Sequence, residues 1–120
     1  MRITIETIQH EHQRYDTCGD WLFLGEPPTE LRIRVSHLGD WRMEALVGLH
    51  EAIEALLCRQ RGISEESVTA FDKAFEGDEP GEDRAAPYHR EHMFAYAMEL
   101  ALMTELGVDF NEYDEKVNAL

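Results

Sequence analysis

The chain has 120 residues and a formal net charge of −14, with 25 acidic residues against 11 basic ones. This length suits one domain with a substantial hydrophobic core, and we treat residues 1–120 as one unit. The acid excess repels phosphate backbones, which argues against a nucleic-acid partner. Because no apolar run approaches the roughly 18 residues of a membrane span, no membrane partner is expected either.

The N-terminus and the two cysteines indicate the cellular compartment in which the protein is expected. Met1–Glu6 lacks the apolar core of a signal peptide. Cys18 and Cys58 are far apart in the sequence and lack the CxxC spacing of thiolate zinc sites, which fits a reducing environment. We therefore expect a cytoplasmic protein. Most of the negative charge, −11, falls in residues 63–120, which favours solubility or attraction of a basic partner.

Residues 1–38 are expected to be rich in β-structure. β-Branched residues dominate 3–8, and apolar residues alternate with polar ones over 31–36, as in strands with one buried face. A short apolar run and a Pro-Pro loop lie between these two segments. We expect a small antiparallel sheet that covers the apolar face of the helices behind it. His10 and His12 stand among polar residues and are expected to be solvated.

Residues 40–120 are expected to be helical, which makes the fold α+β. The expected elements are a helix over 41–61, a helix over 65–76, a loop over 77–87, a helix over 87–106 and a short helix after Asp109. Asp40 and Ser64 are suited to cap the first two helices, because their side-chain oxygens accept from first-turn amides. Gly62 and Gly107 are suited to end the two long helices.

Each long helix carries ionisable residues on the face that periodicity assigns to the core. In the first, an apolar arc of Leu46, Leu49, Ile53 and Leu56 continues through His50 and Glu54. In the second, the seam is His89, His92, Tyr96, Glu99, Met103 and Leu106. Buried ionisable groups are costly unless they are paired, hydrogen-bonded or metal-bound. If the two helices pack antiparallel, imidazoles and carboxylates cluster between them.

A divalent metal site is the first interpretation of this cluster. His50 and Glu54 are four residues apart on one helix face, and one or both of His89 and His92 add further ligands. Mixed nitrogen and carboxylate ligation suits zinc, iron or manganese better than magnesium.

The predicted function is therefore that of a metal-dependent hydrolase. Glu51 or Glu99 is the candidate base for a metal-bound water. If protein ligands fill every coordination position, the metal is instead structural.

Two other interpretations stay open. In one, Glu54 and Glu99 accept hydrogen bonds from His50, His92 or Tyr96 in a structural network without metal. The protein is then a non-enzymatic interaction protein, and its partner is a basic protein or a second copy of the chain. In the other, the helix phases are misassigned and some of these residues are exposed.

The segment His50-Glu51-Ala52-Ile53-Glu54 resembles the HExxH helix of zincin metallohydrolases. The resemblance implies that His50 and Glu54 bind zinc, that Glu51 activates water, and that a downstream His89 or His92 is the third ligand. The sequence departs from the motif where Glu54 replaces its second histidine.

A second resemblance is to the MazG-like nucleotide pyrophosphohydrolases, which are all-α enzymes. Glu51-Ala52-Ile53-Glu54 resembles their first ExxE motif, and Glu105–Tyr113 resembles the segment that closes their core. The resemblance implies magnesium-dependent hydrolysis of a nucleoside triphosphate. Their second acidic motif, ExxD, is not intact, because the corresponding helix offers Glu91 and Phe94. The β-rich first forty residues are also foreign to that family.

Overall fold

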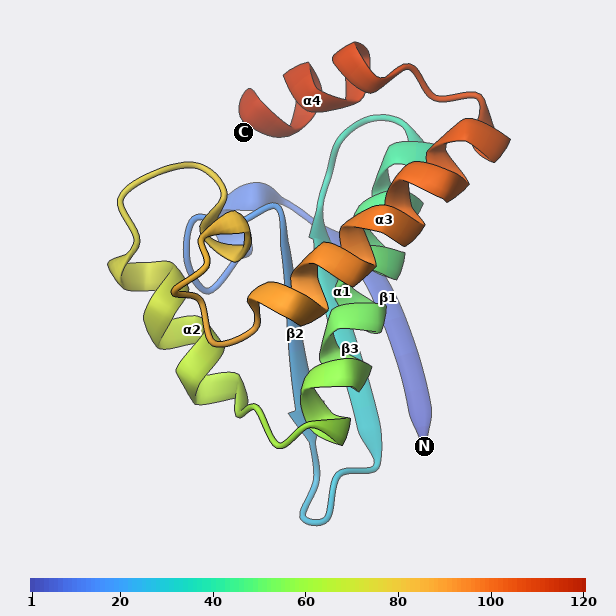
Figure 1. The fold of residues 1–120 in the computed structure, drawn as a ribbon. Coiled ribbons are helices and arrows are strands. Elements are labelled where there is room, and N and C mark those ends of the chain that lie inside the picture. The colour runs from blue at the N-terminus through green and yellow to red at the C-terminus, as the bar shows by residue number, and fades with distance from the viewer.

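Three strands precede four α-helices in the chain, as Figure 1 shows. A computed structural model describes all of residues 1–120. Its elements are β1 (Arg2–Ile8), η1 (His10–His12), β2 (Gly19–Leu24), β3 (Glu30–Ser36), α1 (Trp41–Gln60), α2 (Glu65–Ala74), η2 (Pro80–Glu82), α3 (His89–Leu106) and α4 (Phe110–Asn118). The expected α+β fold is confirmed.

The sheet is mixed, which corrects the expectation of an antiparallel one. Its strand order is β1-β3-β2, with β2 antiparallel to β3 and β1 parallel to β3. A tight turn joins β2 to β3, and this connection favours antiparallel pairing. The longer connection over residues 9–18 lets the chain leave β1 and return on the far side of β3. Strands adjacent in the sequence are therefore not all adjacent in the sheet.

The core lies between one face of the sheet and α1. Its largest contributors are Trp21, Leu31, Ile33 and Val35 from the sheet and Met43, Leu46 and Val47 from α1. Gly48 allows α1 to approach β1 closely, because a Cβ atom there would lie 2.6 Å from Ile5 Cγ2. On its other side α1 packs against α3, so α1 forms the middle layer (Figure 1).

The helix boundaries follow the capping residues closely. Side chains of Asp40, Ser64 and Asp109 accept from first-turn amides of α1, α2 and α4. Gly107 ends α3 in the left-handed conformation, with φ of 68°. None of the helices combines the length and the apolar composition required to cross a bilayer.

The inward face of α1 differs in part from the one that periodicity predicts. Leu49 and Leu56 are exposed, whereas His50 and Glu54 are buried. The polar pair points inward because α3 supplies hydrogen-bonding partners on that side. The two leucines are correspondingly turned outward.

Two isoleucines on one face of the sheet should show how strongly stability depends on the central strand. Ile33 is completely buried on β3, whereas Ile3 on β1 is 49% exposed. Ile33→Ala should lower the free energy of unfolding by about 2–5 kcal/mol, since it leaves a cavity in the core. Ile3→Ala should cost less than about 1 kcal/mol. Urea denaturation of both variants measures the difference, and equal losses would contradict this view of the core.

Candidate metal centre

Three ligand atoms from the two long helices form a compact triangle. His50 Nε2 lies 3.3 Å from Glu54 Oε2, and His92 Nδ1 lies 3.1 Å from each of these two atoms. A tetrahedral zinc ion with bonds of about 2.0–2.1 Å holds its ligand atoms about 3.3 Å apart. The triangle therefore has the dimensions of one face of such a site. These three residues are the ones that the structure brings within metal-binding reach of one another.

A carboxylate behind His50 fixes the orientation of its ring. His50 Nδ1 donates to Glu99 Oε1 at 2.6 Å, and the Tyr113 hydroxyl donates to Glu99 Oε2 at 2.6 Å. With Nδ1 committed to Glu99, Nε2 is the atom that faces the triangle. A carboxylate behind a ligating histidine is a common way to fix its tautomer and increase its basicity. Glu99 thus lies behind the ligand, with both oxygens engaged.

The second ligand of α1 is held in the same way. Trp21 on β2 donates its indole N–H to Glu54 Oε1 at 3.1 Å. The other carboxylate oxygen, Oε2, is left to face His50 and His92. The sheet, α1 and α3 therefore all contribute to the placement of one oxygen atom.

Close packing against η2 positions His92, the ligand from α3. Gly81 lies against the imidazole of His92, and a Cβ atom on Gly81 would collide with that ring. His89 Nδ1 donates to the carbonyl of Gly81 at 2.9 Å. His89, predicted as a ligand, is therefore outside the triangle and instead ties the loop that packs on His92. Both histidines contact Gly81, but only His92 also places a ring nitrogen beside His50 and Glu54.

Two residues of the triangle, His50 and Glu54, carry opposite charges in the metal-free protein. Burial opposes the charged form of His50, but hydrogen bonds to Glu54 and Glu99 outweigh it and raise its pKa to about 11. Burial likewise opposes the charge of Glu54, but hydrogen bonds from His50 and His92 lower its pKa to about 2. The metal-free cluster thus contains an imidazolium held by two carboxylates. A metal ion would replace the proton on His50 Nε2, and its binding would release that proton.

A cavity of about 650 Å³ adjoins the triangle, and Glu51 lines it together with the three candidate ligands. No protein group donates a hydrogen bond to Glu51. Burial, and next the negative charge of Glu54, raise its pKa well above the usual value. Gly19 makes room for this side chain, since a Cβ atom there would lie 2.8 Å from Glu51 Cγ. Glu51 is thus a carboxylate without a protein partner beside the triangle.

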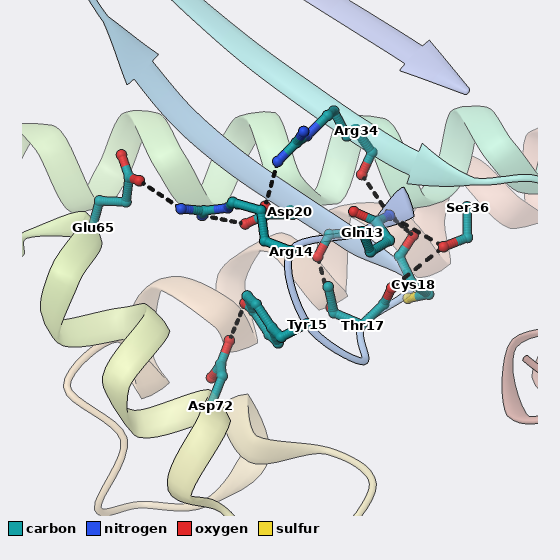
Figure 2. A network of polar contacts seen from close by, with 11 residues as sticks. Gln13, Arg14, Tyr15, Thr17, Cys18, Asp20, Arg34, Ser36, Glu65 and Asp72 are labelled. Atoms are coloured by element: carbon teal, nitrogen blue, oxygen red, sulfur yellow. Dashed lines mark hydrogen bonds and ion pairs between the residues drawn. The ribbon is translucent and has the colours of Figure 1, made fainter. Parts of the chain in front are cut away.

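Figure 2 shows polar contacts between the segment before β2 and residues that line the cavity, among them Asp20, Glu65 and Asp72. Arg14 binds both carboxylate oxygens of Asp20 at 2.7 and 2.8 Å and also contacts Glu65 on α2 at 3.2 Å. The next residue, Tyr15, donates its hydroxyl to Asp72 on α2 at 2.9 Å. These bonds connect β2 to α2 and hold Asp72 at the cavity.

Several site residues were not identified from the sequence. Tyr113 takes the role expected of Tyr96, and Trp21 is the donor to Glu54. Both carry an apolar ring with one polar tip, and this composition is the only signal that could have suggested them. Of the two early histidines, His10 bonds to Ser36 and Asp16 rather than to the triangle, and His12 is exposed.

Two acids of the MazG resemblance, Glu51 and Glu54, line this cavity. Glu91 on α3 is buried and accepts from Arg61 at 2.6 Å, and it does not line the cavity. Compared with models of protein families, with curated proteins and with solved structures, the chain matches none of them.

Glu51→Gln should stabilise the metal-free protein, increasingly so as the pH rises. The folded state binds the Glu51 proton more tightly than the unfolded state, so wild-type stability falls as the pH rises above about 4.5 toward the raised pKa. Glutamine has no proton to lose and escapes this penalty. We expect a gain on the order of 1 kcal/mol at pH 8, which corresponds to a rise of about 4 °C in Tm.

Thermal melts in chelator between pH 5 and pH 8 measure this gain. Glu66→Gln is the matched control, since Glu66 is exposed on α2 and its replacement should shift Tm little at any pH. A wild-type protein that is more stable than Glu51→Gln at pH 8 would contradict the prediction.

Proposed function

We propose that this protein binds one divalent metal ion through His50, Glu54 and His92 and uses it to hydrolyse a substrate held in the adjoining cavity. The observation that carries the proposal is the triangle of ligand atoms 3.1–3.3 Å apart. Three protein ligands leave the fourth position of a tetrahedral ion open, which is typical of catalytic rather than structural sites.

The donor set favours particular metals. Two imidazole nitrogens and one carboxylate oxygen suit zinc, iron or manganese, whereas magnesium prefers oxygen ligands and retained water. The hydrogen bonds behind His50 and Glu54 support tight binding, because both ligands are already oriented. We name zinc as the first candidate, since the spacing matches tetrahedral geometry.

Within this proposal Glu51 and Glu99 have different roles. A metal in the triangle would lower the pKa of a water in its open position toward 7. Glu51 is the base that takes a proton from the attacking water, because it lines the cavity and has no protein partner. Glu99 positions His50 and is not a base, because both of its oxygens are already hydrogen-bonded.

A hydrogen-bonded network without metal is the rival explanation. It accounts for His50, Glu54 and Glu99, whose polar atoms all have protein partners. It gives no role to the cavity or to the unpartnered carboxylate of Glu51. The metal proposal accounts for these features together, and we favour it for that reason.

The direct test is elemental analysis of protein purified without a histidine tag, with thermal melts in the presence and absence of a strong chelator. We expect about one equivalent of zinc, iron or manganese and a lower Tm after chelation, since a ligand bound only to the folded state stabilises it. No metal, together with an unchanged Tm after zinc is added, would make the cluster a structural network and reject the proposal.

Alanine variants should identify the ligands one by one. His50→Ala, Glu54→Ala and His92→Ala should each weaken zinc binding at least ~10-fold in competition with a chromophoric chelator. His12→Ala is the control and should bind zinc like the wild type, because its side chain is exposed and does not line the cavity. Unchanged affinity in the His92 variant would reduce the site to two ligands and contradict the assignment.

Glutamine variants should separate the two candidate bases. Glu99→Gln should weaken zinc binding by about 10–100-fold, because it weakens the acceptor behind His50. Glu51→Gln should keep the zinc affinity of the wild type within about threefold, because Glu51 is not a ligand. The same chelator competition measures both values. The reverse ranking would show that the positioning role belongs to Glu51 instead.

A further inference from the structure

The cavity beside the triangle is strongly acidic. Eleven aspartates and glutamates line it, whereas Lys73 is its one lysine or arginine. Several of these acids have a cationic or imidazole partner, including Asp20, Glu54, Glu65 and Glu99. Asp72 is half-buried and, like Glu51, forms no ion pair with an arginine, lysine or histidine. The cavity therefore contains, on the α2 side, a carboxyl group that no cationic side chain pairs with.

Hydrogen bonds from two tyrosines hold the carboxylate of Asp72. Tyr15 donates to Oδ2 at 2.9 Å, and Tyr88 donates to Oδ1. Each oxygen thus has one phenolic donor and can accept a further hydrogen bond. The neighbouring Lys73 does not neutralise Asp72, since its ammonium lies over the ring of Tyr15, 5.9 Å from the centroid. Tyrosine rings attract cations, and Tyr15 already does so in this structure.

Tyr88 also links Asp72 to the triangle. Its hydroxyl binds Asp72, while its ring lies edge-on to that of His92 with centroids 6.1 Å apart. One tyrosine side chain therefore separates the carboxylate from a candidate metal ligand. A small molecule in the cavity can contact both places at once.

We propose that the substrate of this site carries a cationic group, an ammonium or guanidinium, which binds Asp72 beside Tyr15 and Tyr88 while its hydrolysed bond lies at the triangle. The inference rests on the proposed metal-dependent function and adds the substrate class. A charge-assisted hydrogen bond to a partly buried carboxylate is among the stronger polar contacts. A phosphate or carboxylate in the same place would be repelled by Asp72 and the other acids.

The test uses three capped amino-acid hydroxamates, because hydroxamates chelate metal ions and the side chain can be varied separately. The probes are the Nα-acetyl hydroxamates of lysine, norleucine and glutamate, and calorimetry measures their binding to the zinc-loaded full chain. The lysine compound should bind at least ~10-fold more tightly than the norleucine compound, and the glutamate compound should bind most weakly. Added salt should reduce the preference for lysine.

Asp72→Asn supplies the second arm. This near-isosteric change should remove the preference for lysine over norleucine and leave norleucine affinity unchanged. Glu66→Gln, on the same helix but outside this cavity, should keep the preference. Equal affinity of wild-type protein for lysine and norleucine hydroxamates would overturn the inference while leaving the metal site intact. Failure of the protein to bind zinc or any of the three would overturn the proposed function and this inference together.

Discussion

The hydrogen bond between His50 on α1 and Glu99 on α3 is the contact on which the site depends. It joins the two long helices at a buried position and determines which ring nitrogen faces the triangle. Removing either partner leaves a buried polar group unsatisfied, which costs more than the bond itself contributes. The same bond is compatible with a proton or a metal ion on the opposite nitrogen. The His50–Glu99 bond can thus form in the metal-free protein and in the proposed metal-bound one. The three ligand atoms already lie together without a metal ion.

The sequence predicts the parts of this structure that depend on neighbouring residues. Asp40, Ser64 and Asp109 mark helix starts because capping is local, and His50 with Glu54 identifies the unusual face of α1 because four residues make one turn. The parallel pairing of β1 is not predictable in this way. Its partner is set by how a long connection crosses the sheet, and no local pattern records that path.

The contrast between local patterns and long-range packing also explains which site residues were predicted. His92 and Glu99 follow from the period of α3, but so does His89, which binds the Gly81 carbonyl instead. Periodicity gives a direction around a helix axis and cannot state what lies there. Trp21 and Tyr113 come from separate elements, and their roles depend on the packing of β2 and α4 against the long helices.

The dispersion of the site along the chain has a consequence for biosynthesis. The indole behind Glu54 belongs to β2, whereas the phenol behind Glu99 belongs to α4. While the ribosome is still making α3, the imidazoles lack the partners that orient them, and an ion would meet only a loose chelator. Under the proposed function, tight metal binding would therefore follow the docking of α4, so that folding would precede metal loading.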